Sequence, residues 1–155
     1  GLGDVYKRQV HIAVLPEPMV TIARAANPEL TAALDLTAEW DKVSEAGSLV
    51  QGCVVVRKAF ADEHPNEVKA FLDEYKASIE FLTAEPEQAG QMIQDAGIFA
   101  KAAVAAKAIP NCNVCFVSGA EMQAPLTAFL TALSTVAPQS IGGSVPGDDF
   151  YCVLK

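Results

Sequence analysis

VHIAVLPEPM, residues Val10 to Met19, is the stretch that decides the fold expected of this chain. The apolar run from Val10 to Leu15 is typical of a β-strand buried on both faces. The two prolines within Pro16 to Pro18 end that strand, because proline has no N–H for a ladder hydrogen bond. A strand that leads directly into a helix brings side chains to the carboxyl end of a sheet, where open α/β folds bind ligands. The stretch therefore predicts an α/β fold with a ligand-facing turn at residues 16–19.

The residues on the N-terminal side of this stretch are interpreted as foreign to the fold. GLGDVYKRQ, Gly1 to Gln9, has no apolar period of either two or 3.6 residues, and it resembles an adapter or assembly scar translated in frame. A parallel strand needs neighbouring strands, and no chain precedes Val10 to supply them. We therefore expect residues 10–155 to be the C-terminal half of a larger solute-binding domain.

Composition predicts a folded, acidic protein. Of the 155 residues, 51% are hydrophobic, which is enough for a core of ordinary size, and the net charge is −8. Such a charge argues against a nucleic-acid partner, whose phosphates attract Lys and Arg, and against adhesion to anionic membranes. No run of about 18 uncharged apolar residues is present, so we expect no membrane-spanning helix.

Two further strands and a second candidate site are expected downstream. The strands are Leu30–Leu36 and Leu49–Val56, the latter rich in β-branched residues. Gly52 interrupts the second of them, and a glycine inside a strand marks a bulge or a place where something approaches the backbone closely. Gln51, Gly52 and Cys53 are therefore candidate ligand-binding residues, and a glycine that packs against a crossing helix is the alternative.

The rest of the chain shows the apolar spacing and end signals of helices. Prolines suit the first turn of three of them, and Ser118 with Glu121 forms a capping-box signature for the last. The expected helices are Met19–Ala26, Pro65–Ala84, Pro86–Asp95, Ala100–Ile109 and one from Ser118 to about Val136, which Pro125 either kinks or precedes closely. Residues 138–155 should dock as a terminal strap through Phe150 and Tyr151.

Glu17 is the strongest single candidate for ligand binding. It stands at the predicted strand end between Pro16 and Pro18, which stiffen the backbone, so that its carboxylate loses little entropy on binding an amine or another donor. The alternative, which is compatible, is that Glu17 caps the helix that begins at Met19. Pro16, Glu17, Pro18 and Met19 form the first candidate site.

The cysteines and histidines favour structural roles. Cys112 and Cys115 form the only close cysteine pair, and without further ligands at zinc spacing we interpret them as buried thiols; a disulfide and a metal or redox site are the alternatives. His11 and His64 are expected to be a structural histidine and a helix cap. No nucleophile elbow, phosphate loop or dinucleotide fingerprint occurs. We therefore expect no catalytic residue, no metal and no cofactor.

Five short motifs, in order along the chain, resemble a known family. They are LPEP (15–18), GCVVVRKAF (52–60), EHPNEVKAFLDEY (63–75), EPEQAGQMI (85–93) and PGDDFY (146–151). Together they resemble the C-terminal half of the solute-binding proteins of ABC importers, in particular the nitrate, sulfonate and taurine receptors and their thiamine-precursor relatives. His11 departs from that family, which commonly has aspartate at this strand position.

The resemblance implies a two-lobed receptor of the type II periplasmic-binding fold that holds a small organic or anionic solute between its lobes. It implies a crossing between lobes within residues 10–56, permease subunits as partners, and a place in the periplasm or on the outer face of the membrane. Any attachment to the membrane would be a lipid anchor outside this stretch. Two alternatives are a thiamine-pyrimidine-synthase-like enzyme of the same fold and an independent helical interaction domain starting near Val56.

Overall fold

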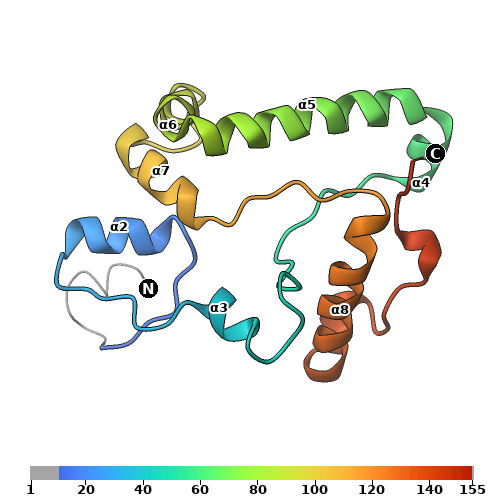
Figure 1. The fold of residues 1–155 in the computed structure, drawn as a ribbon, viewed down its shortest axis with the longest axis horizontal. Coiled ribbons are helices and arrows are strands. Elements are labelled where there is room, and N and C mark those ends of the chain that lie inside the picture. Colours follow the sequence, from blue (N-terminus) through green and yellow to red (C-terminus); the bar gives the residue numbers. More distant parts are fainter. Residues whose placement is uncertain (1–10, 155) are drawn as a thin grey trace. The chain divides into compact units, whose positions relative to one another are not determined.

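The computed structural model describes residues 11–154, and helices make up more than half of them (Figure 1). The helix-rich character expected from the sequence is therefore confirmed. The α-helices are α2 (Met19–Ala26), α3 (Leu36–Trp40), α4 (Lys58–Glu63), α5 (Pro65–Ala84), α6 (Pro86–Asp95), α7 (Ala102–Ala108) and α8 (Ala120–Val136). Short 3-10 turns are η1 (Ile109–Asn111), η2 (Pro138–Ile141) and η3 (Asp148–Phe150).

The chain forms two compact units, and each combines two segments that are distant in sequence. Of the described residues, the first unit contains 11–33 together with Glu74–Phe116. The second contains Leu34–Asp73 together with 117–154. Helix α5 contributes its N-terminal half to the second unit and its C-terminal half to the first.

The three predicted strands are wrong for the residues that the structure describes. No strand is assigned anywhere in residues 11–154, and residues 11–15, 30–35 and 49–57 have no regular secondary structure. A strand exists only through ladder hydrogen bonds to a neighbour, and none of these segments is paired in that way. The last residue of the second predicted strand, Leu36, instead starts α3, because the Asp35 carboxylate accepts from the N–H groups of Thr37 (2.9 Å) and Ala38 (3.3 Å).

The helices predicted from proline and glycine signals are confirmed. α2, α5 and α6 have the predicted bounds, and Gly97 follows α6 with φ of 71°, a value that favours glycine. The predicted capping box is wrong, because Gly119, with φ of 60°, occupies the N-cap of α8 and the helix has no side-chain cap. α8 continues through Pro125, and the short α4 was not anticipated.

The first unit is built around the close approach of α6 and α7. A Cβ atom added to Gly90 of α6 would lie 2.6 Å from the carbonyl oxygen of Ala102 and 3.0 Å from the backbone nitrogen of Ala106. The alanine-rich α7 therefore packs closely against α6. The buried apolar residues of this unit include Ala23, Ala89, Ala105, Ala108 and Ile109.

The second unit is organised around α8 and the C-terminal segment that returns to it. The Tyr151 side chain is buried, and its hydroxyl lies 2.6 Å from the Thr127 hydroxyl of α8. Gln123 Nε2 donates to the Asp148 carboxylate at 2.9 Å. The predicted docking of residues 138–155 is thus confirmed through Tyr151, whereas Phe150 is half exposed.

Candidate functional site

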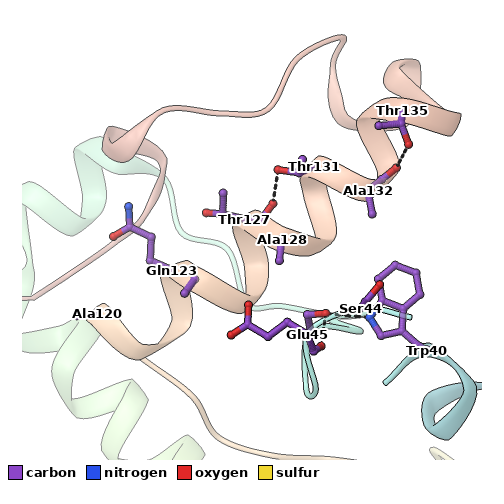
Figure 2. A pocket seen from close by; sticks show the side chains of 12 residues that line it. Trp40, Ser44, Glu45, Ala120, Gln123, Thr127, Ala128, Thr131, Ala132 and Thr135 are labelled. Atoms are coloured by element: carbon purple, nitrogen blue, oxygen red, sulfur yellow. Dashed lines mark hydrogen bonds between the residues drawn. The ribbon is translucent and has the colours of Figure 1, made fainter. Parts of the chain in front are cut away.

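A cleft of about 810 Å³ lies in the second unit, between one face of α8 and the loop that follows α3 (Figure 2). The loop side is lined by Trp40, Ser44, Glu45 and Ser48. The helix side is lined by alanine, threonine and glutamine side chains: Ala120, Gln123, Ala124, Thr127, Ala128, Thr131, Ala132 and Thr135. Its volume falls within the range of roughly 300–1,000 Å³ that is typical of small-molecule sites, and it is a shallow groove that is largely open to solvent.

The loop is held in shape by its own hydrogen bonds. The carbonyl of Trp40 accepts from the N–H groups of Val43 (3.0 Å) and Ser44 (2.9 Å), so the chain turns at once after α3. The Asp41 carboxylate then accepts from the N–H of Gly47 at 3.1 Å. Gly47 has φ of 77°, a left-handed conformation that glycine adopts without strain. These contacts direct the loop back toward α8.

Ser48 fixes the two most distinctive residues of the cleft. Ser48 is 1% exposed, and it is the one buried polar residue among the residues that the structure describes. Its Oγ accepts from Trp40 Nε1 at 2.8 Å and donates to the Glu45 carbonyl oxygen at 2.6 Å. One buried hydroxyl therefore orients the indole and anchors the backbone of Glu45.

Trp40 is also held from the side of α8. Its ring lies 5.9 Å from the ring of Phe129 in an edge-on arrangement. Packing and the Ser48 hydrogen bond together restrict the indole, which is the only tryptophan in the sequence. A restricted aromatic ring is a suitable wall for a ligand, because little side-chain entropy is lost on binding.

The threonines of α8 present acceptors to the cleft. The hydroxyl of Thr131 donates to the Thr127 carbonyl and that of Thr135 donates to the Ala132 carbonyl, each at 2.7 Å (Figure 2). Their protons are thereby used within the helix, while oxygen lone pairs remain. The helix side of the cleft is therefore weakly polar and accepts hydrogen bonds.

The charge of the cleft is negative. Glu45 is its only ionisable lining residue, and no lining residue is basic. Within residues 11–154, the Glu45 carboxylate has neither an ion pair nor a hydrogen bond. Figure 2 shows this carboxylate and the Trp40 indole on the same side of α8.

The first predicted site, residues 16–19, lies in the first unit at the start of α2. The Glu17 Oε2 atom accepts from the N–H of Thr21 at 3.2 Å, and the Pro16 carbonyl accepts from the N–H groups of Met19 (2.8 Å) and Val20 (3.2 Å). The structural alternative for Glu17, a cap on the following helix, is therefore confirmed. Its role in ligand binding stays a prediction.

Glu17 also influences Cys112 in the same unit. The pKa of the Cys112 thiol is raised from 9.0, mainly because partial burial disfavours the thiolate and additionally because of the negative charge of Glu17. The thiol donates to the Ala108 carbonyl oxygen at 3.3 Å. Cys112 is thus held in its protonated form near neutral pH.

The second predicted site, Gln51, Gly52 and Cys53, lies in the second unit, and all three residues are exposed. No atom lies within 4 Å of a Cβ added to Gly52. The alternative of a glycine packed against a crossing helix is therefore wrong for the described structure, since the space beside Gly52 is open. Because the two predicted sites belong to different units, each is described by itself.

The cysteines differ from the expectation of buried thiols. All four are free; Cys112 and Cys115, in the segment after η1, are exposed, and so is Cys53, in the segment between α3 and α4. A search of the described residues finds no group of three or more His, Cys, Asp and Glu side chains able to hold a metal ion. Of the helices described, none has the length and apolar character needed to cross a membrane.

The cleft beside Trp40 was not found by sequence reasoning. Two signals for it are present: a single tryptophan followed by a loop rich in serine and glycine, and small residues at intervals of four along 120–132. The apolar spacing of residues 118–136 predicts the helix but does not point to its face of small residues. Comparison of the chain with protein-family models, with curated proteins and with solved structures finds no match.

Proposed function

We propose that this chain is a catalytically inert receptor for a small solute, the extracytoplasmic binding component of an ABC importer. The observation that carries the proposal is the cleft beside Trp40, whose size suits a small molecule and whose wall combines an aromatic ring, threonine hydroxyls and one carboxylate that has no partner among the described residues. Its lining contains no pair of nucleophile and base, so binding is the chemistry that it supports best.

The resemblance carried by the five ordered motifs supports the proposed fold, partners and location. On that resemblance, the chain is the C-terminal half of a type II periplasmic-binding fold, and permease subunits receive the loaded receptor. The same resemblance supports a periplasmic or surface-anchored location. In a genome, adjacent genes for an ATPase and a permease would be expected, and their absence would argue against the importer.

Ligand binding can be tested directly by thermal unfolding of the full chain against a panel of amines, sulfonates, nitrate and aromatic heterocycles. A ligand present at about 100 times its Kd stabilises the folded protein by about 2.7 kcal/mol, which raises the Tm measurably. Ala128→Leu should abolish the rise, because the added side chain fills the cleft. Ala77→Leu, on an exposed face of α5, should leave it unchanged. A panel without any Tm change would contradict the receptor function.

A second candidate function is an interaction module, and one observation favours it. Val54, Val55, Val56 and Phe60 are large apolar residues of the second unit, and each is at least 39% exposed. Exposed apolar residues gathered along one segment are typical of a surface that binds another protein. Sedimentation of the full chain would detect self-association, and lysine substitutions at Val55 should abolish it.

A further inference from the structure

We infer that the cleft beside Trp40 selects a small organic cation that carries N–H donors, such as a protonated amine or an amidinium. This inference rests on the proposed receptor function and names the chemical class of its ligand. It follows from which hydrogen-bonding groups of the cleft are already occupied within the chain and which remain available.

The donors of the cleft are largely used internally. Trp40 donates its indole N–H to Ser48, Ser48 donates its hydroxyl proton to the Glu45 carbonyl, and Thr131 donates to the Thr127 carbonyl. Thr135 donates to its own helix in the same way. Of the lining side chains, the Ser44 hydroxyl and the second amide hydrogen of Gln123 remain as donors, as does the Thr127 hydroxyl when Tyr151 donates to it. An anion needs several hydrogen-bond donors, so we expect the cleft to bind anions weakly.

The acceptors, in contrast, are available on both walls. The Glu45 carboxylate is without a partner in the described part of the chain, and the oxygens of Thr131 and Thr135 retain lone pairs after donating. A ligand with several N–H groups can satisfy acceptors on the loop and on α8 at once. A charge-assisted hydrogen bond to Glu45 would be the strongest of these contacts.

Trp40 adds a second reason for a positive charge. Tryptophan is the aromatic side chain that attracts cations best over its ring face. Its indole is oriented by Ser48 and Phe129, so the ring does not have to be ordered by the ligand. No basic side chain lines the cleft to compete with the ligand or to repel it.

Three ligands of similar shape but different charge test the inference. They are benzamidinium, benzamide and benzoate, and each is titrated into the full chain. Trp40 is the sole tryptophan, so its fluorescence reports on the cleft itself, and calorimetry gives the affinity. We expect benzamidinium to bind at least about 10-fold more tightly than benzamide, and benzoate to bind least. The affinity for benzamidinium should fall with added salt, because Glu45 is exposed and therefore screened.

Two variants distinguish the role of Glu45 from a general effect of charge. Glu45→Gln keeps the shape of the side chain and should lower the benzamidinium affinity about 10-fold while leaving the benzamide affinity unchanged. Glu63→Gln removes the same charge from α4 in the same unit, away from the cleft lining, and should change neither affinity. Equal losses in both variants would overturn the inference.

The outcomes separate the ligand class from the receptor function. If benzamide or benzoate binds most tightly and alters Trp40 fluorescence, the cationic class is overturned while the cleft stands as a receptor site. If none of the three alters the fluorescence, the cationic class is overturned as well, and the broader solute panel then decides whether the receptor function survives.

Discussion

The Ser48 hydroxyl makes two hydrogen bonds that organise the Trp40 cleft. It accepts from the Trp40 indole and donates to the Glu45 carbonyl, and both partners line the cleft. Analysis of periodicity does not detect a residue such as Ser48, because its contacts, at separations of three and eight residues in a loop, follow no helical or strand repeat. The sequence therefore predicted neither Ser48 nor the site that it organises.

Ser48→Ala should destabilise the protein by about 1–3 kcal/mol, because the indole N–H loses its partner in a buried position. Urea unfolding followed by Trp40 fluorescence measures the change. Ser78→Ala is the matched control: the Ser78 hydroxyl donates to the Glu74 carbonyl on an exposed helix, so its loss should change stability by less than about 0.5 kcal/mol. Equal effects would show that Ser48 has no special role.

Glu17→Gln should lower the pKa of Cys112, because it removes the negative charge that disfavours the thiolate. The expected result is faster alkylation of Cys112 near pH 8, measured by peptide mass spectrometry with Cys115 as the reference thiol. Unchanged alkylation would mean that burial alone raises this pKa.

The same thiol gives the protein a dependence on alkaline pH. The folded pKa of Cys112 lies above its unfolded value of 9.0, so the folded state retains the proton after the unfolded state has lost it. The contribution to stability is complete below pH 9.0 and is lost as the pH rises through the folded pKa. In Cys112→Ser, the free energy of unfolding should fall less steeply above pH 9.0.

At the scale of elements, features set by neighbouring residues were predicted accurately, whereas features that depend on distant residues were not. α5 and α6 start at Pro65 and Pro86, where proline needs no hydrogen-bond donor, and these starts were predicted to the residue. The strand expected at 49–56 failed because a strand also needs a partner that the amino-acid pattern does not specify. The prediction of Ser118 as the N-cap of α8 was wrong, because Gly119 occupies that position and no side chain caps the helix.

The contact between α6 and α7 predicts an unusual response to a helix-favouring substitution. Alanine is a better helix former than glycine by up to about 1 kcal/mol. Gly90→Ala should nevertheless destabilise the protein, by about 1–3 kcal/mol, because its Cβ would meet backbone atoms of α7. Thermal unfolding measures the effect, and Gly52→Ala, with open space around its Cβ, should be nearly neutral. A stabilising Gly90→Ala would contradict the packing described here.

At the scale of the whole molecule, the chain passes between its two units three times, at residues 33–34, 73–74 and 116–117. The first and third passages have no regular secondary structure, whereas the second lies inside α5. Sequence reasoning expected a crossing within residues 10–56 from a family resemblance, and the amino-acid pattern around residues 33–34 gives no sign of it, since residues 28–43 contain neither glycine nor serine.

Limited proteolysis should distinguish these passages. Leu34 is 66% exposed and lies outside any helix, so a protease that cuts after large apolar residues should cleave there first. Phe71 is 51% exposed but lies within α5, where the backbone must unfold before it can enter a protease. Mass spectrometry of the first fragments identifies the site, and Leu34→Gly should slow that cut. Initial cleavage at Phe71 would contradict a stable α5.

The pairing of distant segments has a consequence for how the protein is made. Ribosomes release a chain from its N-terminus, and domains built from one continuous segment fold as they emerge. Here the first unit lacks half of its residues until Phe116 has left the exit tunnel. The second waits for Tyr151, whose hydroxyl meets Thr127. Helix α2 therefore stays without its partners until Phe116 has emerged, and the Trp40 loop stays without its partners until α8 has emerged.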